Sequence, residues 1–255
     1  MLFNHICAQD MISFGLCQVS ALPISGIPPF DAPSRFVVRC SILWGGELKV
    51  KICGITSLAD AMAAIEYGAD ALGFIFAKTS ARFIQKEGIK KIIASLPPFV
   101  TTVGVFTEGT KDQLEEATLE CGIDLIQLHG RFPREIAEYF SERAIQVILV
   151  RNENDLLEYQ MLPARAYLLD SFEGGSGIPF NWEGVRLLRI AREAKKMGRV
   201  ILAGGLTPEN VREAIDIVSP YAVDVCSGVE IEKGKKDHEK MRRFILTAKK
   251  QVTSS

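Results

Sequence analysis

Hydrophobic and polar positions follow a regular pattern only after residue 47. From Leu48 onward, short apolar segments that fit β-strands alternate with stretches whose apolar residues recur every three or four positions, as in helices that cover a sheet. The expected strands are 48–53, 69–76, 99–106, 123–129, 144–150, 164–170, 199–204 and 221–227. Helices are expected at 57–68, 133–142, 181–198, 207–218 and 238–251. Glycines stand where helices would end, at Gly68, Gly122 and Gly198.

Strand-then-helix units repeated in this way predict an α/β protein with a parallel sheet and short crossovers. Eight such strands close into a (β/α)8 barrel, the TIM barrel, here expected as a single domain over 48–255. An open, doubly wound sheet of six or seven units is the alternative. The first strand argues against it, because it is followed by CGITS rather than by a glycine-rich dinucleotide-binding turn.

Residues 1–47 are expected to be an atypical N-terminal extension of this barrel. They hold four prolines and no sustained strand or helix period, and they lack the basic start of a secretory signal. Three interpretations remain: a disordered segment, an accessory segment packed on the barrel, and translation from a start codon upstream of the native one. The abrupt onset of the pattern at Leu48 favours the last. An intact Met1 in mass spectra of the native protein would exclude it.

Composition narrows the possible partners. The chain has 47% hydrophobic and 24% charged residues and a formal net charge of -1, which argues against nucleic acid or an anionic membrane as a partner. No apolar run approaches the roughly 18 residues of a membrane-spanning helix. The six cysteines match no zinc or haem spacing, and a chain of this length can bury a core without disulfides. Free thiols and a cytoplasmic location are therefore expected.

In a TIM barrel the active site lies where the strands end, so the residues at these ends are the candidates. Two of the ends carry glycine-rich turns, AGGLTPENV after the seventh strand and SGVE after the eighth. Glycine after a strand is ordinary turn chemistry. Because both turns occur on adjacent strands, where this fold often binds phosphate, Gly204, Gly205 and the 226–228 turn are predicted to hold a phosphate group. Thr207 is expected to cap the helix that follows.

Cys53 and Asp170 are the candidates for acid–base chemistry. A strand cysteine is often a small buried apolar residue, but Cys53 is the last residue before a glycine, and a stabilised thiolate is an effective base. Cys226 holds a similar position and is the rival. Asp170 follows an apolar strand, so burial at the barrel mouth should raise the pKa of its carboxyl group and suit a general acid.

Several weaker candidates end neighbouring strands. Asp224 lies one residue deeper and could pair with Lys51 inside the barrel. Arg82 could bind a carboxylate with its planar guanidinium group. His129 and Gln127 also reach the mouth, but no second histidine or acidic cluster has metal-ligand spacing, so no metal is expected.

Many of these residues lie in motifs that occur together in one family. The chain resembles the phosphoribosylanthranilate isomerases from about Leu48 to the last helix, in KICGIT (51–56), GADALGFIF (68–76), SAR (80–82), GVF (104–106), IQLHG (126–130), LLD (168–170), GGSG (174–177), LAGGLTPENV (202–211), AVDVCSGVE (222–230) and GKKDHEKM (234–241).

The resemblance implies an Amadori rearrangement of N-(5-phosphoribosyl)anthranilate to 1-(2-carboxyphenylamino)-1-deoxyribulose 5-phosphate, a step of tryptophan biosynthesis. It implies that Cys53 removes the C2′ proton, that Asp170 protonates the ring oxygen and that Arg82 binds the anthranilate carboxylate. The phosphate cradle would comprise Gly204, Gly205, Cys226, Ser227 and Gly228. The implied reaction needs no cofactor, and the implied partner is the small-molecule substrate. The sequence does not give the oligomeric state, so a monomer or a homodimer is expected.

Two departures from the family pattern are visible. Only residues 171–173 separate Asp170 from GGSG, where a longer loop is common, and Cys226 replaces the first serine of the usual SSG turn. Two other functions remain open: a different sugar-phosphate enzyme, such as indole-glycerol-phosphate synthase or a metal-dependent epimerase, and an inactive phosphate-binding barrel. The synthase should show lysines at strand ends and the epimerase paired metal ligands, whereas Cys53 and Asp170 occupy these ends.

Overall fold

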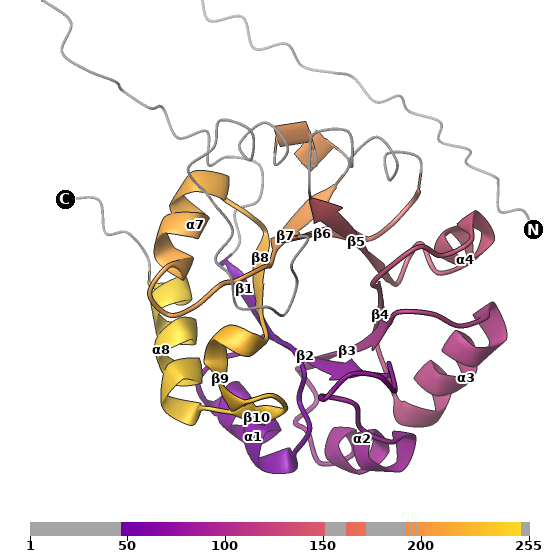
Figure 1. Cartoon of the computed structure of the whole chain (residues 1–255), viewed down its shortest axis with the longest axis horizontal. Helices are drawn as coiled ribbons and strands as arrows, with labels where there is room; N and C mark the ends of the chain where they lie inside the picture. Colours follow the sequence, from indigo (N-terminus) through magenta and orange to yellow (C-terminus); the bar gives the residue numbers. More distant parts are fainter. Residues whose placement is uncertain (1–46, 151–161, 172–191, 194, 197, 251–255) are drawn as a thin grey trace, which may run out of the picture. The chain divides into compact units, whose positions relative to one another are not determined.

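The computed structural model describes residues 47–150, 162–171, 192–193, 195–196 and 198–250. The extension before residue 47 and the short loop after Ser171, both singled out above, lie outside the described residues. Eight parallel strands form a closed ring (Figure 1): β1 Lys49–Ile52, β2 Ala71–Ile75, β3 Thr101–Phe106, β4 Leu125–Leu128, β5 Ala144–Val150, β6 Ala166–Ser171, β7 Arg199–Leu202 and β8 Ala222–Val225.

The ring closes because β1 pairs with both β2 and β8. This pairing confirms the predicted barrel and excludes the open sheet. Each expected strand is present, with bounds that differ from the expected ones by at most two residues.

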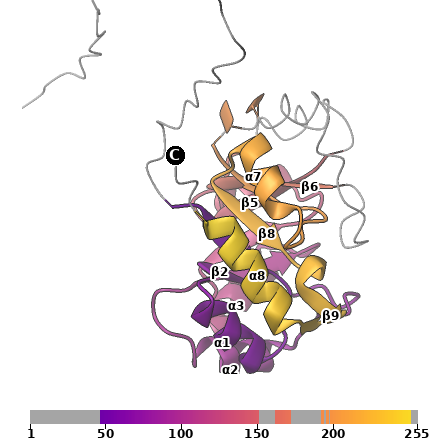
Figure 2. The same ribbon diagram turned by 90° about the vertical axis from the view of Figure 1, so that its left-hand side faces the viewer.

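Helices cover the outside of the ring where the structure describes the connections. They are α1 Leu58–Glu66, α2 Lys86–Ile93, α3 Lys111–Cys121, α4 Arg134–Tyr139, α7 Val211–Val218 and α8 His238–Lys249. Four of the five expected helices correspond to α1, α4, α7 and α8, while α2 and α3 were not named from the sequence. The helix expected at 181–198 lies largely outside the described residues. Figure 2 shows α8 between α7 and α1. In the described part of the chain, no helix is long and apolar enough to cross a membrane.

The fourth expected helix begins later than predicted. This helix, expected at 207–218, corresponds to α7, which begins at Val211. The residues just before Val211 form a turn. In this turn the Thr207 hydroxyl accepts a hydrogen bond from the Glu209 amide at 3.2 Å, and the Thr207 amide donates to Asn210 Oδ1 at 2.8 Å. Thr207 therefore stabilises the turn rather than capping the helix directly.

Alternation along the strands determines which side chains enter the barrel. Val103, Leu168 and Ile201 belong to the cluster that fills the interior. Lys51 and Asp224 also face inward, where they contact each other. Cys53 and Cys226, each two positions further along its strand, therefore point into the mouth, which settles the orientation that the sequence left open.

A small hairpin follows β8. A 3-10 turn, η1 (Ser227–Val229), leads into β9 (Glu230–Glu232), which pairs with β10 (Lys235–Lys236). The hairpin was not expected from the sequence. Its tip is tied to the loop after β1, because the Thr56 hydroxyl donates a hydrogen bond of 2.5 Å to the Gly234 carbonyl. This contact brings the hairpin beside the residues that follow Cys53.

Candidate active site

Cys53 and Cys226 lie side by side at the barrel mouth. The β1–β8 register pairs Lys51 with Asp224, and the next strand bond runs from the Cys53 amide to the Val225 carbonyl at 2.8 Å. Cys53 is thus opposite Cys226 on the neighbouring strand, and the hydrogen bond that the Cys226 thiol donates runs to Glu230 Oε1, at 4.0 Å. Both are free cysteines, and only 5% of Cys53 is exposed.

Two glycines leave room for this thiol pair. A Cβ atom at Gly73 on β2 would lie 2.9 Å from Cys53 Sγ. A Cβ atom at Gly54 would lie 2.9 Å from Cys226 Sγ and 2.8 Å from Arg82 Cδ, and the φ of Gly54 is +71°, which favours glycine. Side chains at either position would displace the sulfur atoms.

Beneath the thiols, Lys51 Nζ and Asp224 Oδ1 form an ion pair of 2.9 Å that is almost fully buried. The pairing that the sequence left open for Asp224 is therefore present. Burial alone would lower the pKa of Lys51, but Asp224 and Cys53 together raise it above its ordinary value. Lys51 therefore carries a permanent positive charge next to Cys53.

The surroundings of the two thiols differ, and so do their pKa values. The neighbouring Cys226 thiol and the charges of Lys51 and Lys236 lower the pKa of Cys53, against the opposing effects of burial and Asp224. The neighbouring Cys53 thiol, together with burial, raises the pKa of Cys226 well above its ordinary value. Of the two, Cys53 therefore ionises first, and a thiolate base becomes chemically accessible at this position.

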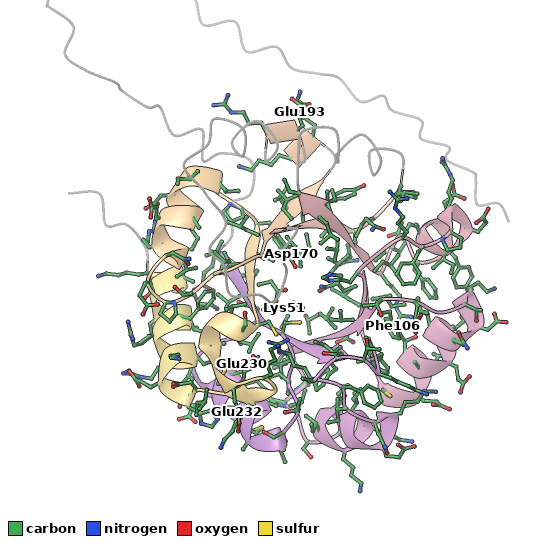
Figure 3. All side chains as sticks on the ribbon, in the orientation of Figure 1. Lys51, Phe106, Asp170, Glu193, Glu230 and Glu232 are labelled. Carbon is green, nitrogen blue, oxygen red and sulfur yellow. The ribbon has the colours of Figure 1, made fainter. Side chains whose placement is uncertain are left out.

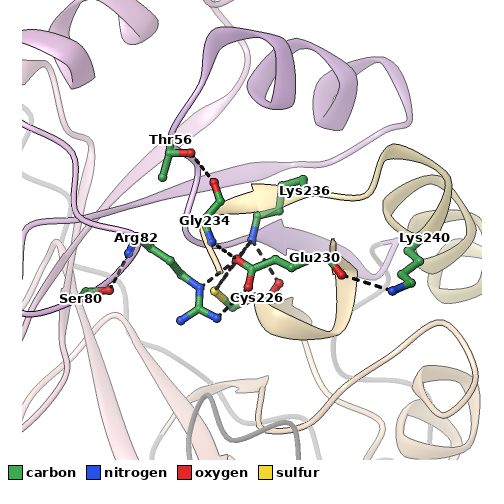
Figure 4. A network of polar contacts seen from close by, with 8 residues as sticks. All are labelled: Thr56, Ser80, Arg82, Cys226, Glu230, Gly234, Lys236 and Lys240. Carbon is green, nitrogen blue, oxygen red and sulfur yellow. Dashed lines mark hydrogen bonds and ion pairs between the residues drawn. The ribbon is translucent and has the colours of Figure 1, made fainter. Parts of the chain in front are cut away.

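The hairpin adds a second buried charge network (Figure 4). Arg82 donates from Nε and Nη2 to the two carboxylate oxygens of Glu230, at 2.8 and 2.7 Å. Lys236 Nζ, whose side chain is 0% exposed, donates to Glu230 Oε1 at 3.0 Å and to the Cys226 carbonyl at 3.1 Å. Burial would raise the pKa of Glu230, but Arg82 and Lys236 lower it, so the carboxylate stays ionised.

This network constrains how Arg82 could act. Its side-on edge, formed by Nε and Nη2, is occupied by Glu230. A ligand carboxylate would therefore have to use the other edge of the guanidinium group, which includes Nη1. Sequence reasoning missed both Glu230 and Lys236, although they lie within the SGVE and GKK strings.

The two glycine-rich turns predicted to bind phosphate are in contact. Gly204 and Gly205 have φ values of 85° and 62°, a conformation that favours glycine. A Cβ atom at Gly228 would lie 1.9 Å from the Leu206 carbonyl oxygen, so only glycine allows η1 to pack on the turn after β7. Asn210, also missed from the sequence, stabilises this turn by donating from its side-chain nitrogen to the Gly205 carbonyl at 2.9 Å.

Asp170 faces the same interior from β6. The β6–β7 and β7–β8 registers place Ala203 between Asp170 and Asp224, so a single small residue separates the two carboxylates along the ring. Figure 3 shows the labelled Asp170 and Lys51 toward the centre of the ring. Asp170 therefore lies at the same mouth as Cys53. It comes from β6, which is separated from β8 by β7 alone.

Gln127 and His129 extend the interior surface on β4. Gln127 is 3% exposed, and its Oε1 atom has no hydrogen-bond partner among the described residues. Burial and the charge of Lys51 lower the pKa of His129, so its imidazole is neutral near pH 7. The described residues include no group of three or more His, Cys, Asp or Glu side chains able to hold a metal ion.

Comparison with known proteins places this barrel in a family. A family model described as N-(5′-phosphoribosyl)anthranilate (PRA) isomerase matches residues 50–247. The chain belongs to this family. The match confirms the resemblance inferred from the motifs, and it lies within the barrel domain expected over 48–255.

Individual family members are similar over the same region. An N-(5′-phosphoribosyl)anthranilate isomerase from Geobacter metallireducens is 48% identical over 206 residues, which are 79% of this chain and 99% of that protein. A crystal structure of phosphoribosyl anthranilate isomerase in complex with reduced 1-(o-carboxyphenylamino)-1-deoxyribulose 5-phosphate has a TM-score of 0.71 and 40% identity, covering 79% of this chain and 98% of that one. A third relative is a monomeric form of the dimeric enzyme from Thermotoga maritima, with a TM-score of 0.69, 38% identity and the same coverage.

Proposed function

We propose that this chain catalyses the Amadori rearrangement of N-(5′-phosphoribosyl)anthranilate to 1-(2-carboxyphenylamino)-1-deoxyribulose 5-phosphate, in the biosynthesis of tryptophan. Membership of the isomerase family supports the reaction. The observation that carries the chemistry is Cys53, an interior thiol at a strand end whose pKa is lowered by its neighbours.

Asp170 and Cys53 act in sequence. Asp170 donates a proton to the furanose ring oxygen, the bond from that oxygen to C1′ breaks, and the nitrogen lone pair forms the C1′ imine. The protonated imine acidifies C2′, so the Cys53 thiolate removes the proton there, and the electron pair moves toward nitrogen to give an enolamine. Tautomerisation of this enol yields the amino-ketose. Because Lys51 lies beside Cys53, the thiolate is present without a separate base to generate it.

Arg82 binds the anthranilate carboxylate through the edge of its guanidinium group that Glu230 leaves available. Glu230 and Lys236 act through Arg82 and through the Cys226 carbonyl, as positioning residues. A preset guanidinium group loses little side-chain freedom when the substrate binds.

The phosphate group binds between the two glycine-rich turns. Backbone amides of Gly204, Gly205, Ser227 and Gly228 are available for close approach because these residues have small or no side chains. Cys226 contributes to this cradle through its backbone, since its thiol lies against Cys53. On β4, the buried Oε1 atom of Gln127 could accept a hydrogen bond from a ribose hydroxyl, and the neutral His129 could donate or accept one.

The catalytic unit is the barrel of residues 48–255, and the partner is the small-molecule substrate. The chain acts as a monomer or as a homodimer. Both states are known for the Thermotoga maritima relative, a dimeric enzyme whose monomers also have a crystal structure. In this reaction only protons pass between the side chains and the substrate, so no cofactor is required. Three free thiols in the described residues are compatible with work in the reducing cytoplasm.

Loss of the substrate's anthranilate fluorescence on addition of the purified full chain is the direct test. Cys53→Ser and Asp170→Asn should each lower kcat by about 100- to 10,000-fold, the usual contribution of a general base or acid. Arg82→Ala should mainly raise KM. Cys121→Ser, which changes a buried thiol on α3 remote from the mouth, is the matched control. Fluorescence decay no faster than spontaneous breakdown of the substrate would refute the proposal.

A further inference from the structure

We propose that Lys236 is the cation of the phosphate subsite. From behind the turn that follows β8, it holds the Cys226 carbonyl, so that the Ser227 amide of the same peptide faces the phosphate group. The inference deepens the proposed function, because it rests on phosphate binding between the two glycine-rich turns. Lys236 acts through the peptide rather than on the substrate, so it is a positioning residue.

The buried charges around Lys236 do not balance. Its side chain is 0% exposed, and its Nζ atom donates to Glu230 Oε1 at 3.0 Å and to the Cys226 carbonyl at 3.1 Å (Figure 4). Glu230 also accepts two hydrogen bonds from Arg82. One carboxylate therefore serves two cations, and the three side chains together carry a net positive charge. A buried charge is costly unless an anion compensates it, and the phosphate group is such an anion.

The peptide between Cys226 and Ser227 carries the effect of Lys236 to the mouth. The strand ends at Val225, and Cys226, with a φ of −125° and a ψ of −82°, has left the extended conformation. The peptide is trans, so its carbonyl and its N–H point in opposite directions. Because the carbonyl points to the buried Lys236, the Ser227 N–H points to the other side, where residues 226–228 are partly exposed.

The turn after β7 lies against the same peptide segment. A Cβ atom at Gly228 would lie 1.9 Å from the Leu206 carbonyl oxygen, so the Ser227 amide is held close to the Gly204–Gly205 turn. The residues proposed for the cradle, 204–205 and 226–228, have no charged side chain of their own. A hydrogen bond to a peptide carbonyl polarises the N–H of that peptide and makes it a stronger donor. Lys236 therefore supplies a cradle of backbone amides with the charge that it lacks.

The test is the affinity of the full chain for inorganic phosphate, measured by isothermal titration calorimetry and as an inhibition constant in the fluorescence assay. Lys236→Met removes the amine, keeps a side chain of similar length and leaves Arg82 and Glu230 as a balanced pair. It should raise the Kd of phosphate about 10-fold, the lower end of what a hydrogen bond to a charged group contributes. The Kd of benzoate, a carboxylate probe for Arg82, should change by less than about threefold.

Turnover gives a second readout. Lys236→Met should raise KM about 10-fold and leave kcat within about twofold, because the phosphate group takes no part in proton transfer. Arg82→Ala should show the reverse selectivity in binding, with weaker affinity for benzoate and nearly unaltered affinity for phosphate. Lys236→Gln keeps a donor on a shorter side chain, so its phosphate Kd should lie between those of the parent chain and Lys236→Met.

Lys195→Met is the matched control. Lys195 Nζ donates to the Val218 carbonyl at 2.6 Å, at the C-terminal end of α7. Helices of this fold run back from the mouth, so this contact lies at the opposite end of the barrel. The same substitution there removes the same kind of contact and should leave both affinities within about twofold.

Two outcomes would overturn the proposal. One is a phosphate Kd in folded Lys236→Met that matches that of the parent chain. The other is an equal loss of affinity for phosphate and benzoate, which indicates support of the whole site rather than of the phosphate subsite. If Lys236→Met does not fold, Lys236→Gln undergoes the same two comparisons. A parent chain that binds phosphate but does not consume the substrate would instead reject the proposed function, so the two failures are distinguishable.

Discussion

Gly73 controls the position of the catalytic thiol, and Gly73→Ala should expose this dependence. The added Cβ atom would lie 2.9 Å from Cys53 Sγ, 3.1 Å from Cys53 Cα and 3.2 Å from Lys51 Cε. Carbon and sulfur atoms in contact normally stay about 3.5–4.0 Å apart, so the sulfur must withdraw by on the order of 1 Å. Both the base and the cation beside it are displaced.

The expected cost to catalysis exceeds the cost to folding. A displacement of about 1 Å at a reacting group can lower the rate up to about 100-fold, and we expect a loss of about 10- to 100-fold in kcat/KM. Overpacking by one methyl group in a filled interior destabilises by about 1–3 kcal/mol, equivalent to a fall in Tm of about 2–12 °C for a barrel of this size. Kinetics at a temperature well below both Tm values therefore separates the two effects.

Gly104→Ala supplies a matched control. Gly104 lies on β3 next to β2, but its added Cβ would face outward, 2.8 Å from Phe106 Cε2 and 3.1 Å from Phe76 Cε2. The crowding is similar and the catalytic thiol is not involved, so Tm should fall while kcat/KM stays within about threefold of the parent value. Equal activity in the two variants would refute the claim that Gly73 sets the Cys53 position.

Three further results are expected. Glu230→Gln leaves Arg82 and Lys236 as buried cations without their carboxylate, so it should cost about 3–5 kcal/mol in unfolding free energy by chemical denaturation and raise KM; an unchanged KM would contradict the positioning of Arg82. Gly228→Ala should force η1 away from the Leu206 carbonyl and weaken inhibition by inorganic phosphate at least about 10-fold, whereas an unaltered inhibition constant would place the phosphate elsewhere. Oxidised glutathione should inactivate the enzyme: opposite residues on neighbouring strands are about 4.8 Å apart, within disulfide range, so Cys53 and Cys226 lose two electrons and two protons while glutathione disulfide becomes two thiols. Dithiothreitol should restore activity, and peptide mapping that finds no Cys53–Cys226 link would reject this route.

Most of the barrel could be predicted from the sequence because its strands are nearly continuous apolar runs separated by helix periods. Those signals are local, and the strand bounds came out within two residues. Closure of the ring is not a local property of the sequence, because it depends on pairing between the first and last strands. The α2 and α3 helices were not named, although α3 carries a capping box between Thr110 and Gln113 that is visible in the sequence.

The candidate site could be predicted as a set of strand ends, but its internal contacts could not. Position at a strand end placed Cys53 and Asp170 at one rim. The direction of a side chain at that rim depends on register, which follows from the pairing of β1 with β8 rather than from either strand alone. The thiol contact between Cys53 and Cys226 is therefore a product of closure, as is the pairing of Lys51 with Asp224.

The hairpin shows the limit most clearly, and it also explains why the site is built as it is. Glu230 and Lys236 are charged residues in a short polar stretch, a pattern that normally indicates a solvated loop. Their burial follows from Arg82, which lies 148 residues from Glu230 in sequence and gives the carboxylate a bidentate partner. Without Lys236, the charges of Arg82 and Glu230 would still balance, but the Cys226 carbonyl would lose its hydrogen-bond donor. One buried carboxylate thus holds two cations, one directed to the proposed substrate carboxylate and one to the residue beside the proposed base, so the binding and proton-transfer halves of the site share a single electrostatic support.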